Sequence, residues 1–224
     1  MNELDAFSEA VSAKKARTAS KAARRQQLMD ATIQSIAKFG LSGTTMTTVT
    51  QIAGLSRGLA NFHFETKQNL FEETLRYLAD EHHQHWKSQY EKANLAPAAK
   101  LQSIVAAHFH PTICNRKKLA VWYAFFGEAG ARASYRKMVN DIDAERRKLT
   151  FILCQEIIKQ GGYKNVDPED VTSTLEALYD GFWLNFLMDP GDMRRSFSAN
   201  RVARYLWQVF PNHFDQPLPI PPKE

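Results

Sequence analysis

Apolar residues recur three and four positions apart along most of this chain, and no segment keeps the alternation of a β-strand. Between residues 24 and 39, Leu28, Ile33 and Ile36 fall on one helix face, and Gly40 follows as the expected C-cap. Further helices are predicted over residues 45–53, 57–64, 66–94, 117–129, 134–160, 168–188 and 198–210, with other helix starts at Pro97 and Pro111. The sequence therefore predicts an all-α fold of about nine helices.

The chain length suits one or two domains, since a domain usually contains about 100–200 residues. Of its 224 residues, 44% are hydrophobic and 24% are charged, which is ordinary globular usage. No apolar run approaches the roughly 20 residues of a membrane-spanning helix, and the N-terminus lacks the apolar core of a signal peptide. Cys114 and Cys154 lack zinc-ligand spacing and are expected to be core thiols. These features favour a soluble, cytoplasmic protein without a membrane partner.

Positive charge is concentrated in the first quarter of the chain. The formal net charge is +5; residues 1–64 hold eight Lys and Arg against four Asp and Glu, and residues 65–224 hold 21 against 20. The basic residues from Lys14 to Arg25 have no acid between them, which predicts a mobile basic arm over residues 1–21. The arm either wraps DNA or is only solvated. Five of the nine prolines lie in residues 211–224, which predicts an extended Pro-rich tail.

Two short predicted helices, 45–53 and 57–64, are separated by the turn Gly54-Leu55-Ser56. Glycine supplies the backbone conformation of such a turn, and serine caps the following helix. The arrangement indicates a helix-turn-helix, whose second helix enters the major groove of DNA. The expected exposed polar groups of that helix are Arg57, Asn61 and His63. Its apolar residues, which pack or contact thymine methyl groups, are Leu59, Phe62 and Phe64.

Motifs that carry catalysis are missing from the sequence. The histidines His82, His83 and His85 have no cysteine or carboxylate at metal-ligand spacing, so a half-buried or solvated helix face is the favoured interpretation over a metal site. Phosphate-binding glycine loops, a GxSxG turn and paired Cys/His motifs are not found. We therefore expect a protein that is not an enzyme and that uses no cofactor or metal.

The run from Gly54 to Leu70 resembles the recognition helix and the next helix start of TetR-type transcriptional repressors. Its sequence is GLSRGLANFHFETKQNL, with the glycine, aromatic, lysine and leucine positions characteristic of that family. Segments 24–32, 121–126 and 175–184 are similar to the BetI-type subgroup, which contains regulators of choline and betaine metabolism. The resemblance covers roughly residues 22–210.

The resemblance implies a homodimer that places two heads in successive major grooves of a palindromic operator. It divides the chain into a helix-turn-helix DNA-binding domain over residues 22–68 and an effector-binding and dimerisation domain over residues 69–210. Asn61 and Phe62 stand where the family often carries two tyrosines, so Phe62 lacks a hydroxyl for phosphate and Asn61 could read adenine instead. The implied DNA-contacting residues are Thr45, Thr47, Ser56, Arg57, Gly58, Asn61, Phe62, His63 and Lys67.

Apolar and aromatic residues form stripes on two predicted helices of the larger domain, and such stripes are more often core than a binding site. One stripe contains Leu119, Trp122, Phe125, Phe126 and Ala129; the other contains Val171, Leu175, Leu178, Phe182 and Phe186, with Tyr179 and Trp183 alongside. The family places its effector pocket among these helices, where an aromatic cage could hold a quaternary ammonium by cation-π attraction. The expected ligand-binding residues are Trp122, Phe126, Tyr179, Asp180 and Trp183, with Glu128 as another source of compensating charge. Asp180 could equally be a hydrogen-bonded cap. The expected dimer interface contains Phe186, Arg201, Tyr205, Leu206 and Val209.

The sequence thus predicts a sequence-specific DNA-binding repressor that a small-molecule inducer, such as choline or a related quaternary ammonium, releases from its operator. One alternative is a TetR-type regulator of another pathway with a different apolar or aromatic ligand. Outside this class, the alternatives are a nonspecific architectural DNA binder and a helical interaction module.

Overall fold

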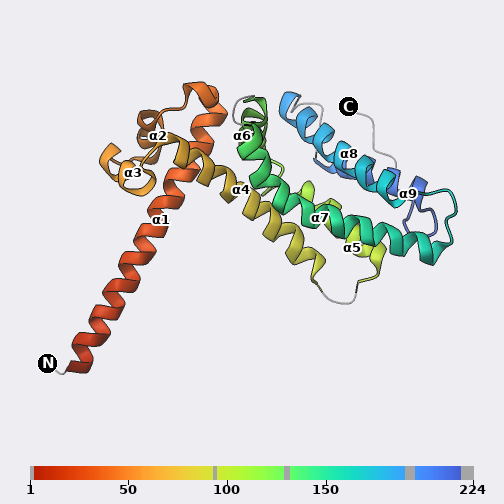
Figure 1. The fold of residues 1–224 in the computed structure, drawn as a ribbon, viewed down its shortest axis with the longest axis horizontal. Helices are drawn as coiled ribbons and strands as arrows, with labels where there is room; N and C mark the ends of the chain where they lie inside the picture. Colours follow the sequence, from red (N-terminus) through yellow and green to blue (C-terminus); the bar gives the residue numbers. More distant parts are fainter. Residues whose placement is uncertain (1–2, 93–94, 129–131, 190–194, 218–224) are drawn as a thin grey trace. The chain divides into compact units, whose positions relative to one another are not determined.

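The computed structural model describes residues 3–92, 95–128, 132–189 and 195–217, with side chains described from residue 21 onward except for several within 132–142. These residues form nine α-helices and no strand, as the sequence predicts (Figure 1). The helices are α1 Glu3–Gly43, α2 Met46–Ala53, α3 Arg57–Phe64, α4 Lys67–Tyr90, α5 Pro97–His108, α6 Arg116–Gly127, α7 Arg132–Gly161, α8 Pro168–Met188 and α9 Arg195–Val209. The chain divides into two compact units, Met1–Leu75 and Arg76–Glu224.

The start of α1 differs from the sequence prediction. The helix begins at Glu3 rather than near Arg24, so the backbone of the predicted arm continues the first helix. The arm is rich in Ala, Lys, Arg and Glu, which have high helix propensity, and this explains the extension. Its mobility stays a prediction. The expected interruption at Gly40 is confirmed, because this residue has φ 71° and ψ 176° inside α1.

The ends of α2 and α3 are fixed by the predicted caps. The Thr45 hydroxyl accepts a hydrogen bond from the Thr48 amide at 3.1 Å, and the Thr48 hydroxyl accepts one from the Thr45 amide at 2.9 Å. Gly54 ends α2 in the left-handed conformation at φ 64°. The Ser56 hydroxyl then accepts from the Leu59 amide at 3.2 Å and starts α3. The two short helices therefore have the predicted bounds.

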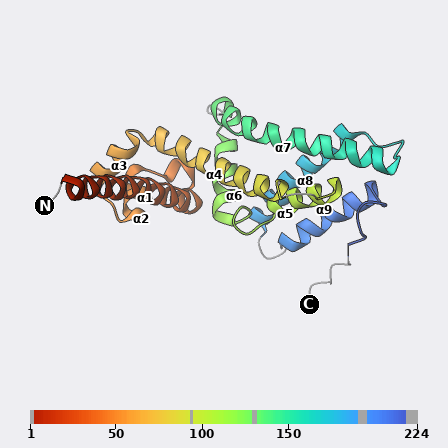
Figure 2. The same cartoon turned by 90° about the horizontal axis from the view of Figure 1, so that it is seen from below.

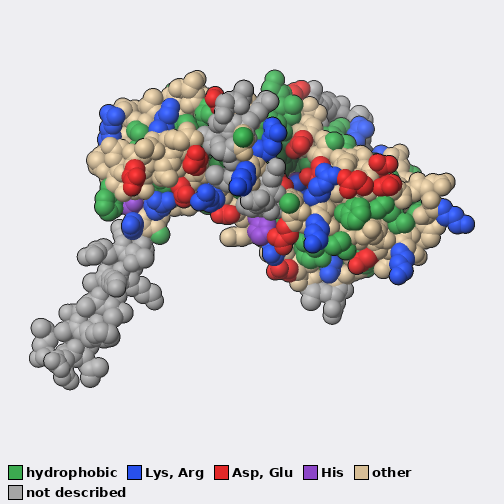
Figure 3. Space-filling view, viewed as in Figure 1, with side chains coloured by type: hydrophobic (Ala, Val, Ile, Leu, Met, Phe, Trp, Pro, Cys, Tyr) green, Lys and Arg blue, Asp and Glu red, His purple; other side chains and the backbone are tan. Residues whose placement is uncertain are grey.

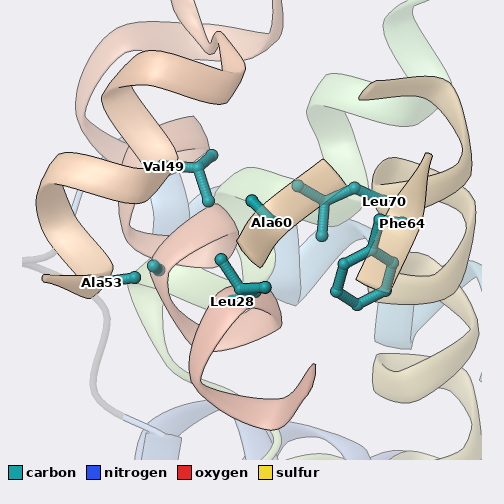
Figure 4. Packing of buried hydrophobic residues seen from close by; sticks show 7 residues of the cluster. Leu28, Val49, Ala53, Ala60, Phe64 and Leu70 are labelled. Atoms are coloured by element: carbon teal, nitrogen blue, oxygen red, sulfur yellow. The ribbon is translucent and has the colours of Figure 1, made fainter. Parts of the chain in front are cut away.

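Four helices of the N-terminal unit share one apolar core (Figure 4). Its labelled members are Leu28 from α1, Val49 and Ala53 from α2, Ala60 and Phe64 from α3, and Leu70 from α4. Burying a large apolar side chain contributes about 1.5–3 kcal/mol. Because Ala60 and Phe64 turn one face of α3 into this core, the opposite face of the helix is directed to solvent.

In the C-terminal unit, α8 packs against α6, α7 and α9. Figure 2 shows α7 along one side of this unit and α9 along the other. The aromatic stripe on α8 is rotated relative to the sequence prediction: Tyr179 and Trp183 are buried, whereas Leu178 and Phe182 are only half-buried. Figure 3 shows acidic and basic side chains interspersed over the visible face of this unit.

Pro111 does not begin a helix, contrary to the sequence prediction. It lies in a turn between α5 and α6, and Asn115 caps α6 by accepting a hydrogen bond from the Lys118 amide at 3.1 Å. The other predicted proline starts are confirmed, with Pro97 and Pro168 in the first turns of α5 and α8.

Two further expectations concern burial and membranes. Cys114 and Cys154 are buried free thiols, and loss of solvation raises the pKa of each to about 11. Among the residues that the structure describes, none of the helices is both long and apolar enough to cross a bilayer.

Candidate functional site

The solvent-directed face of α3 presents Arg57, Gly58, Asn61 and Phe62. Phe62 is 70% exposed, so a large apolar side chain is in contact with water. A Cβ atom added at Gly58 would meet nothing within 4 Å, so packing within the chain does not require glycine at this position. This face is open to a partner from outside the chain.

His63 is not on this open face, which corrects the sequence prediction of an exposed groove-lining residue. Only 8% of it is exposed, because α3 turns it inward beside the apolar core. Its carbonyl oxygen accepts a hydrogen bond from Arg25 Nη1 at 2.7 Å, and Arg25 also pairs with Glu73 at 3.1 Å. Burial, with the charges of Arg25 and Lys21, lowers the pKa of His63. His63 therefore helps to fix α3 on α1.

The remaining predicted DNA contacts lie at helix starts. Thr45 and Thr47 are exposed at the start of α2, and Ser56 is exposed at the start of α3. Lys67 is exposed at the start of α4, where its ammonium donates a hydrogen bond to the Thr44 carbonyl at 3.4 Å. Backbone amides at such helix starts favour anions such as phosphate.

A cavity of about 50 Å³ lies inside the C-terminal unit, between residues of α4, α5, α6, α7 and α8. This volume holds a compact group of a few heavy atoms. The residues that line it are His82, His108, Trp122, Tyr123, Phe126, Asp143, Arg146, Glu176, Tyr179, Asp180 and Trp183. The lining thus combines aromatic rings with charged groups.

Aromatic contacts order the cavity walls. Trp122 and Phe126 on α6 are stacked at 6.0 Å between ring centroids, and His108 and Tyr179 are stacked at 3.9 Å. The indole of Trp183 donates a hydrogen bond to the His108 carbonyl at 3.0 Å. The wall rings are therefore held in place by contacts with one another.

Charged groups in the cavity are dominated by carboxylates. Arg146 is 5% exposed and pairs with Asp143 at 3.4 Å and with Glu176. Asp180 is the most exposed of the three carboxylates. Loss of solvation is the main cause that raises the pKa of each of the three, and Arg146 opposes the rise. With all four groups ionised, the lining has a net charge of minus two, which favours a cation.

Burial disfavours the protonated form of the two histidines of the cavity. His108 Nδ1 donates to the Ile104 carbonyl at 3.0 Å, so its Nε2 accepts from Arg146 Nη1 at 2.6 Å. The ring of His82 meets that of His108 edge-on at 4.8 Å. Burial, followed by the charge of Arg146, places the pKa of both histidines well below the ordinary value.

Comparison with known proteins assigns the family. Residues 28–74 match the tetR family of bacterial regulatory proteins, and residues 97–211, just over half of the chain, match the C-terminal region of BetI-type transcriptional repressors. The chain belongs to the TetR family, in its BetI-type group. It is 34% identical to the HTH-type transcriptional regulator BetI of Burkholderia thailandensis, over 75% of this chain and 84% of that protein.

Solved structures share the fold of the chain. A transcriptional regulator from Saccharomonospora viridis in complex with choline has a TM-score of 0.71 at 17% identity, covering 81% of this chain and 94% of that chain. AibR in complex with isovaleryl coenzyme A and operator DNA has a TM-score of 0.65 at 16% identity, covering 84% and 98%. The chain therefore shares the fold of these two solved structures.

For this TetR-family chain, the ligand-binding residues were predicted from the aromatic stripes in the sequence. The structure brings all five predicted ligand residues, Trp122, Phe126, Tyr179, Asp180 and Trp183, to the cavity lining. Glu128 is exposed at the end of α6 and is not among the lining residues. The prediction missed His82, His108, Tyr123, Asp143, Arg146 and Glu176.

The residues predicted for the TetR-type dimer interface differ in exposure. Leu206 is 1% exposed within the chain itself, so it is not available to a partner; this corrects the sequence prediction. Phe186, Tyr205 and Val209 are half-buried, and Arg201 is exposed. On α8, two larger apolar side chains are open: Leu184 is 43% and Met188 is 74% exposed.

Proposed function

We propose that this TetR-family regulator is a homodimeric repressor that binds a palindromic operator and releases it when a small cation, such as choline, enters the cavity. The observation that carries the ligand class is the cavity lining, which combines aromatic rings with three carboxylates and one guanidinium. The regulator from Saccharomonospora viridis, solved in complex with choline, supports the same class.

The cavity suits a quaternary ammonium for two physical reasons. Trp122 and Phe126 offer aromatic faces, which attract cations by about 0.5–2 kcal/mol depending on desolvation. Arg146 forms ion pairs with Asp143 and Glu176 but not with Asp180. We therefore assign to Asp180 the negative charge that balances the charge of the ligand. An uncharged or anionic ligand would leave this excess of negative charge uncompensated.

On the DNA side, we assign the open face of α3 to the major groove. Arg57 and Asn61 are its polar groups, Phe62 supplies apolar contact, and Gly58 allows close approach. Thr45, Thr47, Ser56 and Lys67 are assigned to backbone phosphates, because helix starts and lysines favour them. Phosphate contacts position the protein, whereas the α3 side chains select the sequence.

We assign the dimer contact to the exposed face of α8. Ala177, Gly181, Leu184 and Met188 follow one another at spacings of three and four residues, and all are exposed. A second copy of the chain, related by two-fold symmetry, would bury this stripe against itself. A dimer also matches the two half-sites of a palindrome.

The test starts with DNA fragments selected from a random pool, followed by footprinting with and without choline or betaine aldehyde. We expect a symmetric footprint that choline weakens. A footprint that neither compound changes would contradict the proposed cationic ligand but not the proposed repressor function. It would favour a regulator with another ligand. Binding without a preferred site would indicate an architectural DNA binder, and no DNA binding would indicate an interaction module.

This function requires no catalytic step, cofactor or metal, so we propose that the protein is not an enzyme. Among the described residues, no group of three or more potential metal ligands lies together. A repressor acts where bacterial DNA lies, so we place the protein in the cytoplasm.

A further inference from the structure

Two buried polar atoms in the cavity lining stand apart from the others. Tyr179 is 2% exposed and His82 is 4% exposed, and both line the cavity. Neither Tyr179 Oη nor His82 Nε2 has a hydrogen-bond partner within the described part of the chain. Buried polar groups are normally hydrogen-bonded, so these two atoms call for a partner from outside the chain.

Neighbouring polar groups are already satisfied, which makes the pair distinctive. Both ring nitrogens of His108 are used, the indole of Trp183 bonds the His108 carbonyl, and the Tyr123 hydroxyl donates to the Asp180 carbonyl at 2.8 Å. Glu176 Oε1 and Arg146 Nε also lack partners, but both groups are held in the ion pair between them.

The two atoms come from one wall of the cavity, which we name the histidine–tyrosine wall: His82 from α4, His108 from α5 and Tyr179 from α8. Its three rings contact each other, with His82 edge-on to His108 and His108 stacked on Tyr179. The aromatic pair Trp122 and Phe126 lies on another helix, α6. The cavity therefore offers an aromatic group for a cation and a separate hydrogen-bonding wall.

The chemistry of this wall selects an uncharged oxygen. A phenol both donates and accepts hydrogen bonds, and a neutral imidazole nitrogen does one or the other according to its tautomer. A carboxylate is disfavoured here, because Asp143, Glu176 and Asp180 surround the cavity and Arg146 is already engaged by two of them. A hydroxyl or aldehyde oxygen carries no charge, so these carboxylates do not repel it and it does not need Arg146 as a partner.

We propose that Tyr179 Oη and His82 Nε2 form a subsite for an uncharged oxygen, so that the natural ligand is a small cation carrying a hydroxyl or carbonyl group. This inference rests on the proposed function and adds a second recognition point to it. It predicts discrimination against a bare tetraalkylammonium, which lacks the oxygen, and against a zwitterion, whose oxygen is charged.

The test measures binding of three probes to the full chain by calorimetric titration: choline, tetramethylammonium and glycine betaine. We expect choline to bind about 3- to 10-fold more tightly than tetramethylammonium, the range that one net hydrogen bond provides. Glycine betaine should bind more weakly than choline. In the Tyr179→Phe variant, the ratio of choline affinity to tetramethylammonium affinity should fall toward one, with the tetramethylammonium affinity unchanged.

The matched control is Tyr123→Phe, which removes a cavity hydroxyl that the chain already uses in the bond to Asp180. Its ratio of choline to tetramethylammonium affinity should stay that of the parent chain. His82→Gln should keep more of the ratio than His82→Leu, because the glutamine amide still hydrogen-bonds and the leucine side chain does not. Ratios measured within each variant are independent of the fraction that is folded.

The outcomes separate the two ideas. Equal binding of choline and tetramethylammonium by the parent chain, or equal weakening of both in Tyr179→Phe, would overturn the subsite while leaving the cation site in place. Glycine betaine that binds as tightly as choline would overturn the preference for an uncharged oxygen. If none of the three binds, the cation proposal fails and the subsite fails with it.

Discussion

At Gly58, we expect folding and DNA binding to favour different residues. Gly58 lies in the first turn of α3 and has room for a Cβ, and alanine is favoured over glycine in a helix by up to about 1 kcal/mol. We expect Gly58→Ala to raise the free energy of unfolding by roughly 0.5–1 kcal/mol, as measured by urea denaturation. The same variant should bind the operator more weakly in a gel-shift titration, because the methyl group occupies the open face of α3. Operator affinity equal to that of the parent chain would remove Gly58 from the DNA surface.

Asn61 and Lys67 should affect DNA binding in different ways. Asn61→Ala should relax base preference at one position, since an Asn–adenine pair contributes about 1–3 kcal/mol of discrimination. Lys67→Ala should weaken all sequences alike and lower the salt slope by about one unit. Binding-site selection and salt titration distinguish the two effects. Unchanged selectivity in the first variant, or an unchanged slope in the second, would contradict the assignment.

The cavity carboxylates make ligand binding depend on pH. Because burial raises the pKa of Asp143, Glu176 and Asp180, protonation removes their negative charge at a higher pH than usual. Arg146 stays charged, and His82 and His108 can only gain positive charge, so every change on acidification opposes a cation. We expect full choline affinity near neutral pH. On acidification the affinity should fall, and the fall should begin at a pH above 4.5, the ordinary pKa of glutamate. Affinity that stays constant down to pH 4 would argue against these groups.

At the scale of the helix, the sequence predicted the bounds of those helices that have a capping or end-forming residue at the helix end itself. The bounds of α2, α3 and α8 follow from Thr45, Gly54, Ser56 and Pro168, whose side chains or backbone act within one turn. Pro111 was misassigned because a proline also suits a turn, and only the cap at Asn115 decides where α6 begins. Local signals fix helix ends, whereas the extent of α1 depends on propensity summed over many residues.

The basic segment at the start of α1 provides a prediction for one element. Deleting residues 1–21 removes Lys14, Lys15, Arg17 and Lys21, so nonspecific DNA affinity at low salt should fall by the loss of counterion release. Deleting residues 1–13 is the matched control, because it removes three acidic residues and no basic one. The measurement is fluorescence anisotropy with random-sequence duplex. Equal affinity of the two truncated chains would assign the arm to solvent alone.

At the scale of the whole molecule, the open face of α8 should control assembly. Replacing Leu184 or Met188 with Glu should shift the dimer toward monomer in sedimentation equilibrium, because the charge would be buried between copies. Affinity for the full palindrome should fall more than affinity for a half-site. Leu95→Glu is the control, since Leu95 is similarly exposed at 41% but lies outside α8. A dimer that survives both α8 substitutions would place the interface elsewhere.

The candidate site was predictable only where its residues share a pattern. Trp122 and Phe126, or Tyr179 and Trp183, recur four residues apart and are visible as stripes. Arg146 is followed by Arg147 and Lys148, and the sequence does not tell which of the three is buried. Its partners come from α5, α7 and α8, so this network exists only after long-range packing.

The buried guanidinium of Arg146 has a consequence for how ligand specificity can change in evolution. Arg146 joins α5, α7 and α8 through His108, Asp143 and Glu176, so a substitution on that side of the cavity leaves a buried charge unpaired. Phe126 is 39% exposed and its side chain has no polar atom, so replacing that side chain leaves no buried charge unpaired. New ligand preferences should therefore arise first by substitution on α6, while the charged side of the cavity is inherited with the fold.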